Sequence, residues 1–193
     1  MGGMLFFSRS IVFLTSFCLM TMEILAGRVT APYLGVSLYT WTSIIGVILA
    51  GVTVGNYVGG FLADRFLSRK TLGLSIAFAG CSALISNVLA PALGPSLSTS
   101  GWPLPISILI FSFAVFFPVA FFLSTVSPQV VKFDLHNLER VGMTVGSIGA
   151  ASAIGSILGT LLTGFIFIQY LGTRFLVLGV ATFLLLLGCL VAW

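Results

Sequence analysis

GVTVGNYVGGFLADRFLSRK, residues 51–70, is an apolar run with regularly spaced glycines that ends in a cluster of charges. Gly51, Gly55 and Gly59 stand four residues apart, so on a helix they lie along one face. Helices in a membrane associate by close packing, and small residues at this spacing let two backbones approach. The stretch predicts a tightly packed membrane-spanning helix that ends at a water interface, where the following charges lie: Asp64, Arg65, Arg69 and Lys70.

The composition of the whole chain agrees with a lipid environment. Of its 193 residues, 59% are hydrophobic and 6% are charged, whereas a soluble domain carries about 25% charged residues. An apolar run of about 20 residues crosses a bilayer as a helix. We therefore expect an all-α integral membrane protein, a single transmembrane domain over residues 1–193. The six apolar runs are roughly residues 10–27, 41–62, 71–91, 104–127, 143–168 and 174–193.

The orientation follows from the Lys and Arg residues, which are enriched in cytoplasmic loops. With the N-terminus inside, Arg28 and Arg174 lie outside, and six basic residues lie inside. These six are Arg9, Arg65, Arg69, Lys70, Lys132 and Arg140. The sequence predicts cytoplasmic N- and C-termini in a plasma membrane of the bacterial inner-membrane type. The basic charge is explained by this topology, and nothing in the sequence indicates nucleic acid.

The chain contains an internal repeat. A shift of 104 residues aligns the second apolar run with the fifth, and three spans per copy require the copies to face opposite ways through the membrane. Inverted repeats of this kind build many secondary transporters. We expect two inverted three-helix repeats, at about 5–91 and 104–193. The aligned pairs include Gly51 with Gly155, Gly55 with Gly159, Gly60 with Gly164, and Lys70 with Arg174.

The glycines of both copies are predicted to pack helices together. Small residues four apart flatten a helix face, and the second and fifth spans are expected to face each other through such stripes. An alternative is that the two helices rock against each other during transport. The predicted packing residues are Gly51, Gly55, Gly59, Gly155, Gly159 and Gly164.

The charged segment resembles the loop signature of the major facilitator superfamily. That signature contains a glycine, an Asp-Arg pair, a short turn and a basic pair, and the resemblance implies a loop that latches neighbouring helices on the cytoplasmic side. This sequence lacks the glycine of the turn and has one residue added before Arg69. The alternative is a basic anchor at the cytoplasmic interface. The matching residues are Gly60, Asp64, Arg65, Arg69 and Lys70.

Longer segments extend the likeness to about residues 15–180. The segments EILAGRVTAPYLGVSLYTWTSIIGVILAGVTVGNYVGGFLADR and SAIGSILGTLLTGF resemble the membrane part of the fused major-facilitator/spermidine-synthase-like proteins. The resemblance implies a soluble aminopropyltransferase-like partner domain. The chain has no glycine-rich nucleotide loop, and its three cysteines have no metal-ligand spacing. We therefore expect no cofactor, no metal site and no catalysis on this chain.

Glu23 and Arg28 are ionisable residues of the first span. Glu23 lies about fourteen residues into that span, or about 21 Å along a helix axis, where a charge is costly and usually has a partner or lines a cavity. Because Pro32 disfavours helix at the residue before it, a helix end at Gly27 would let Arg28 fold back. A structural Glu23–Arg28 latch and a site for a cation or proton both remain open. Asn56 is expected to make an interhelical hydrogen bond rather than bind a ligand.

Residues 127–142 form the largest polar stretch. Apolar residues recur there at helical spacing, which predicts a short amphipathic helix on the cytoplasmic surface. His136 lies in this segment without other ligand types at metal-binding spacing, so we expect it to be solvated.

Two functions are compatible with these features. The first is a membrane scaffold, anchor or accessory subunit with a transporter-derived fold, which holds a soluble synthase-like enzyme or belongs to a larger membrane complex. The second is a transporter of a small cation such as a polyamine, acting as an oligomer. The polyamine comes from the family resemblance alone. The repeat favours transport, whereas the scarcity of polar groups within the spans favours the scaffold.

Overall fold

The protein is a bundle of long helices in the computed structural model, which describes the backbone of residues 2–135 and 141–193 and their side chains from Phe6 onward. Arg140 and His136, which were assigned to the cytoplasmic surface, lie outside the described residues. The helices are α1 (Gly2–Leu34), α2 (Leu38–Arg65), α3 (Arg69–Ser98), α4 (Leu104–Ser124), α5 (Val126–Asp134), α6 (Val141–Leu162), the π-helical turn η2 (Thr163–Phe167), α7 (Ile168–Tyr170) and α8 (Thr173–Ala192).

Six segments are long and apolar enough to cross a membrane, which confirms the predicted all-α, six-helix membrane fold. The second, fifth and sixth segments match the expected runs to within three residues at each end, and the first, third and fourth continue seven residues further at their C-terminal ends. The six are Phe6–Leu34, Leu38–Arg65, Arg69–Ser98, Leu104–Asp134, Val141–Tyr170 and Thr173–Ala192.

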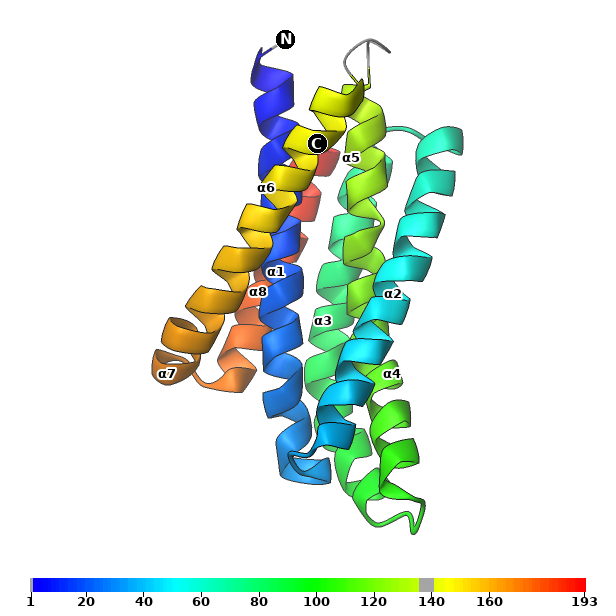
Figure 1. Ribbon diagram of the computed structural model, residues 1–193, viewed down its shortest axis with the longest axis vertical. Coiled ribbons are helices and arrows are strands. Elements are labelled where there is room, and N and C mark those ends of the chain that lie inside the picture. The colour runs from blue at the N-terminus through cyan, green and yellow to red at the C-terminus, as the bar shows by residue number, and fades with distance from the viewer. Residues whose placement is uncertain (1, 136–140) are drawn as a thin grey trace.

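The segments run up and down, so both chain ends lie at the same end of the bundle (Figure 1). In this view α2 and α6 lie in front, with α6 crossing α1 and α2 crossing α4. Helix α8 is the shortest span and begins part-way along α3: Thr173 borders the same cavity as Pro91, whereas α3 continues to Ser98.

The glycines of α2 form the contact with α4. Gly51 lies against Phe117, whose carbonyl oxygen would be 3.1 Å from an added Cβ, and Gly55 lies against the carbonyl of Phe121. Gly59 continues the contact one turn further on, where an added Cβ would be 2.5 Å from the carbonyl oxygen of Thr125. These three glycines let the two backbones touch, as small residues do in membrane helix pairs.

The glycines of α6 pack on α1 and not on α2. Gly155 lies against the carbonyl of Phe13. A Cβ added to Gly159 would be 2.5 Å from the carbonyl oxygen of Phe17. The expectation that the two glycine stripes face each other is therefore wrong. Each stripe contacts a different helix, because a small-residue face allows close approach without selecting the neighbour.

Gly164 does not belong to the packed glycines. It lies in the π-helical turn η2, and a Cβ added there would have no neighbouring atom within 4 Å. The prediction that it packs against another helix is wrong. The buried residue of that turn is Thr163, whose hydroxyl donates to the Thr21 hydroxyl at 3.0 Å.

A third close contact joins α3 and α8. Gly73 and Gly188 lie opposite each other: a Cβ on Gly188 would be 2.7 Å from the Gly73 carbonyl oxygen and from the Ala77 nitrogen. Gly80 meets the same helix near Ala181. This pair was not expected from the sequence.

Two apolar clusters fill the space between the helices. One contains Leu25, Ile76 and Leu184, which are fully buried between α1, α3 and α8. The other contains Ile44 and Phe111, fully buried where α2 meets α4. Both clusters include residues of α1, which therefore lies at the centre of the bundle.

Helix α1 does not break at Gly27, as the sequence had suggested. It runs through Pro32 to Leu34 and ends before Gly35, which has a φ of +73°. Gly27 packs closely against the ring of Trp41, which would lie 2.9 Å from an added Cβ. Proline is tolerated in membrane helices because neighbouring groups satisfy the freed backbone.

The polar stretch after α4 is not a surface helix over its described part. α5 continues the fourth span and buries Gln129 and Asp134. The Gln129 side-chain amide donates to the Ser75 hydroxyl at 3.0 Å, and Asp134 accepts from the Ser8 hydroxyl at 2.9 Å. Partners on α3 and α1 offset part of the cost of burying these polar groups, although the second carboxylate oxygen of Asp134 is buried without a partner among the described residues.

Candidate functional site

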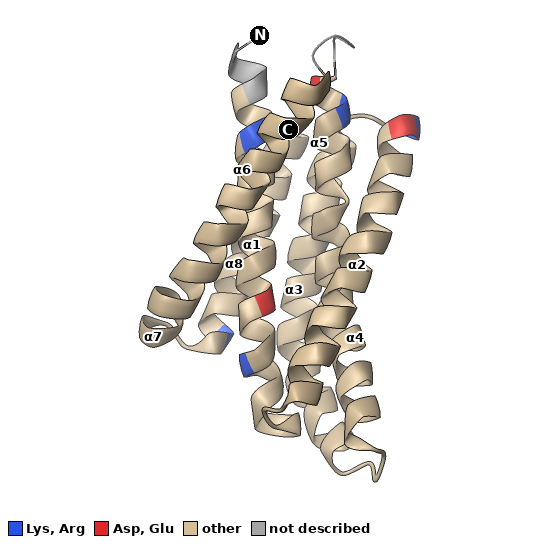
Figure 2. Cartoon of the chain, in the orientation of Figure 1, with Lys and Arg blue, Asp and Glu red and all other residues tan. Residues whose placement is uncertain are grey.

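The charges are distributed unevenly along the bundle. Most Lys and Arg residues gather at the end where both termini lie, as Figure 2 shows. Arg28 and Arg174 belong to the opposite half, in the last part of α1 and at the start of α8. Acidic residues of the described chain are few, so these two arginines have few possible counter-charges.

The last turn of α2 is linked to the fourth span by an ion pair. Asp64, in the last turn of α2, accepts a hydrogen bond from the Lys132 ammonium of α5 at 2.9 Å. The two side chains are 72% and 49% exposed, so the pair contributes about 0–1 kcal/mol. It joins neighbouring helices at the end of the bundle that carries both termini.

The other residues of the loop signature have separate contacts. Arg65 lies over the ring of Phe61 one turn back, and Arg69 lies over the ring of Phe7 in α1, at 5.6 and 5.3 Å from the ring centres. Lys70 is exposed, and Gly60 has open space where a Cβ would be. Two residues of the signature, Asp64 and Arg69, therefore reach another span.

Glu23 lies half-buried on α1, beside a small apolar crevice between α1, α2 and α4. Ile48 and Phe116 are among the residues that border this crevice. Among the described residues, its carboxylate has no ion pair and no hydrogen bond. An ionisable group at this depth usually faces a partner, a cavity or the bundle interior.

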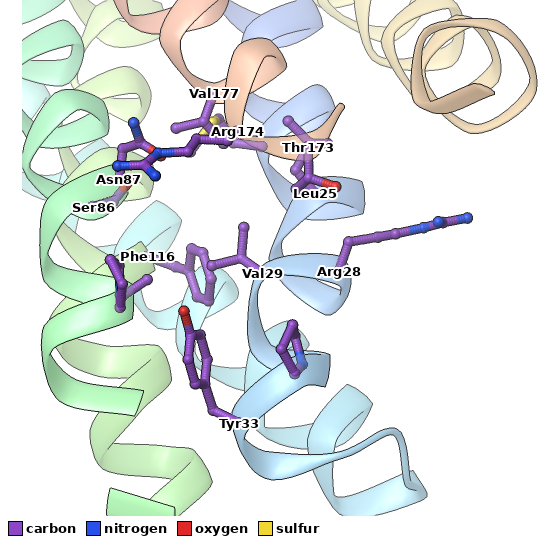
Figure 3. A pocket seen from close by; sticks show the side chains of 14 residues that line it. Leu25, Arg28, Val29, Tyr33, Ser86, Asn87, Phe116, Thr173, Arg174 and Val177 are labelled. Atoms are coloured by element: carbon purple, nitrogen blue, oxygen red, sulfur yellow. The ribbon is translucent and has the colours of Figure 1, made fainter. Parts of the chain in front are cut away.

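Arg28 does not pair with Glu23. The helix is regular between them, so their side chains leave the axis about 140° apart, and no ion pair joins them. The Arg28 side chain is exposed and points away from the cavity beside it (Figure 3). The latch fails because the helix end at Gly27, on which it depended, is absent.

This separation gives a stability prediction. We expect the effects of Glu23→Gln and Arg28→Ala on the free energy of unfolding to add within about 0.5 kcal/mol, as for independent sites. Unfolding of the two single variants and the double variant in mixed micelles measures the sum. A coupling above about 1 kcal/mol would contradict the geometry and restore the latch.

Asn56 makes no hydrogen bond to another helix within the described chain, so the predicted interhelical bond is not formed there. It is exposed on α2, on the same helical face as Gly46 and Thr53, which are also exposed. This face is turned away from the glycines that contact α4. A polar and small-residue surface is thus left open on α2.

Helix α6 has a similar outward face. Gly142, Gly146, Gly149 and Ala153 lie along one side of the helix and are all exposed. A Cβ added to any of the three glycines would have no neighbour within 4 Å. Only Ile148, Gly155 and Gly159 of α6 are buried.

A cavity that was not expected from the sequence opens in the half of the bundle away from the termini. It has a volume of about 260 Å³ and lies between α1, α3, α4 and α8. Arg174 and Asn87 point toward each other across it, and the Tyr33 hydroxyl points into the same space (Figure 3). The sequence signal was weak: Arg174 was one of two basic residues expected outside, and Asn87 follows Ser86 in a span that already contains several small polar residues.

Within the described residues, no three His, Cys, Asp or Glu side chains lie together as metal ligands would. Comparison with protein-family models, curated proteins and solved structures gives no match for this chain. The site residues above therefore rest on their own geometry.

Proposed function

We propose that the chain consists of two inverted three-helix repeats related by the 104-residue shift. The contacts support this relation. Gly51 contacts Phe117, and Gly155 contacts Phe13. The shift of 104 residues takes Gly51 to Gly155 and Phe13 to Phe117, so each contact corresponds to the other. The contact of Gly55 with Phe121 corresponds in the same way to the contact of Gly159 with Phe17. The four pairs of equivalent positions are 13 and 117, 17 and 121, 51 and 155, and 55 and 159.

The helix boundaries follow the same shift. α3 begins at Arg69 and α8 begins at Thr173, 104 residues later. The segment from α6 to α7 covers the positions that match α2, and α4 with α5 covers those that match most of α1. Because transporter folds are often built from such inverted repeats, we infer transporter ancestry.

The orientation belongs to the same proposal. The end that holds both termini also carries most Lys and Arg residues, and basic residues are enriched on the cytoplasmic side. Both termini are then cytoplasmic, and the Asp64–Lys132 pair joins α2 and α5 at the cytoplasmic end of the bundle.

The function proposed for this fold is that of a membrane scaffold or accessory subunit. The observation that carries it is the outward face of α6, where Gly142, Gly146 and Gly149 are exposed without a neighbour. Lipid-facing surfaces have no need of aligned glycines, whereas helix contacts in membranes are enriched in them. The open polar face of α2 offers hydrogen-bonding capacity to another helix.

The partner on this face is a helical membrane subunit, either a second copy of the chain or a different protein in a larger complex. The resemblance to the fused spermidine-synthase-like proteins adds a soluble aminopropyltransferase-like enzyme, which would bind at the cytoplasmic end. In that arrangement the chain itself carries no catalytic step and anchors the enzyme to the bilayer.

The test is association in mild detergent. We expect purified wild-type protein to elute with a mass above that of the monomer, and mass spectrometry of the particle to identify a second copy or another subunit. Gly146→Leu should abolish this association, because a leucine on the outward face of α6 prevents backbone contact.

The matched control is Gly179→Leu in α8. Gly179 is also exposed, with no atom within 4 Å of an added Cβ, but it lies on α8 and not on the outward face of α6. This variant should associate like the wild type. As monomers, both leucine variants should have the same free energy of unfolding as the wild-type protein. A wild-type protein that is monomeric with no bound protein, in detergent and in nanodiscs, would refute the scaffold.

A second candidate, transport of a small cation by an oligomer, is favoured by one observation. Glu23 is half-buried and lacks a counter-charge among the described residues, as expected of a carboxylate that receives a cation. In that case Glu23→Gln should fold normally and lose uptake of a polyamine such as spermidine into vesicles. Wild-type vesicles without uptake above protein-free vesicles would exclude this function.

A further inference from the structure

The cavity beside α8 combines an apolar wall with polar groups that converge. Leu25, Val29, Phe116 and Val177 form much of the wall. It is recessed within the bundle, because α8 begins beside Asn87 while α3 continues for eleven further residues to Ser98. A cavity of this kind, apolar with a few placed polar groups, is the usual form of a ligand site.

Arg174 gives the cavity its charge. Its guanidinium points inward, toward Asn87 and Ser86 (Figure 3). Among the described residues it has no ion pair and no hydrogen bond, and no acidic residue lines the cavity. Arg174 is an exposed residue, and because no acidic residue lines the cavity, its guanidinium is available to pair with an anionic ligand.

The neighbouring donors have fixed positions. The Tyr33 ring fills the space against Gly94, where an added Cβ would overlap it, and packs against Phe111 with ring centres 6.1 Å apart. Its hydroxyl is thereby held in the cavity with the Asn87 amide, and neither group has a hydrogen-bond partner in the described chain. Preorganised donors of this kind favour a ligand with several acceptor oxygens.

We propose that this cavity binds a phosphate group, with Arg174 as its charge partner and Asn87 and Tyr33 as further donors. Arginine binds phosphate oxygens through two parallel N–H bonds, and a phosphate has oxygens left for the amide and the hydroxyl. The volume of about 260 Å³ admits a phosphate with a short substituent. The phosphate comes either from a phospholipid headgroup at this end of the bundle or from a soluble phosphate ester.

Two measurements on the full chain test the site and identify the source. Inorganic phosphate is added to protein in a detergent without phosphate, and the unfolding temperature and the calorimetric binding constant are recorded. Separately, native mass spectrometry counts the phosphatidylglycerol molecules that stay bound after release from mixed micelles. Binding of phosphate alone assigns a soluble ligand, and retention of lipid without a response to phosphate assigns a headgroup; both support the site.

Arg174→Gln should weaken whichever binding is observed by at least tenfold. Arg28→Gln is the matched control, because Arg28 borders the same cavity but points away from it, and it should bind like the wild type. Should Arg174→Gln fail to fold, Asn87→Leu and Tyr33→Phe replace it, each with an expected loss of at least threefold. The proposal is overturned if the wild type binds neither probe, if both arginine variants lose binding equally, or if no cavity variant changes it.

Discussion

Gly55→Leu is expected to lower the free energy of unfolding by at least about 3 kcal/mol, the upper end of the usual cost of overpacking. The Cβ of any residue at this position overlaps the carbonyl of Phe121, and the Ser124 side chain lies 3.0 Å away. A backbone carbonyl within a helix cannot rotate aside as a side chain can. The helices α2 and α4 must therefore separate along their whole contact, and the loss is large.

Gly46→Leu provides the control on the same helix. Gly46 is exposed, and no atom lies within 4 Å of an added Cβ, so in the monomeric protein leucine there should leave the stability unchanged or raise it through its better helix propensity. Unfolding in mixed micelles, followed by circular dichroism, compares the two variants. Equal stability of Gly55→Leu and Gly46→Leu would show that the α2–α4 contact is not formed.

The second large effect concerns α3 and α8. Gly73→Leu and Gly188→Leu should each cost about 3 kcal/mol, and the double variant should cost little more than either one. The two glycines lie opposite each other, so the first leucine already separates the helices. The second leucine is then added where the helices no longer touch, and it costs little more. Such strong coupling is expected only for residues that share one contact.

Gly55 and Gly159 form the comparison pair, because they belong to different helix contacts. Their double variant should cost about the sum of the single variants, provided that enough folded protein remains to measure. The same unfolding assay serves both pairs. Full additivity for Gly73 and Gly188 would mean that these residues do not touch across α3 and α8.

The positions of the spans could be predicted from the sequence because hydrophobic length and charge decide them. The glycines at 51, 55, 155 and 159 were also recognised as packing residues, since their spacing is a property of one helix. Their partners could not be predicted. Which helix meets a flat face depends on the arrangement of all six spans, and α2 and α6 turn their glycines toward α4 and α1.

The contact of α3 with α8 escaped prediction for a different reason. Gly73, Ala77 and Gly80 stand among residues of mixed size, and the partner surface around Gly188 lies in a run of leucines, so neither helix shows an unbroken stripe. The cavity donors were missed because Tyr33, Asn87 and Arg174 belong to three different helices. Only the fold brings them together.

The short α8 has a consequence for the bilayer around the protein. Its 20 residues reach about 30 Å at 1.5 Å per residue, whereas the 30 residues of α3 reach about 45 Å. Lipids beside α8 therefore meet a helix close in length to a normal hydrocarbon core, whereas α3, which packs against it, extends further. A mismatch of this kind costs a fraction of a kcal/mol per Å and is relieved by tilt or by local change of membrane thickness. The bundle should tilt toward its α8 flank and thin the leaflet there, which brings the phosphate layer of the membrane closer to Arg174.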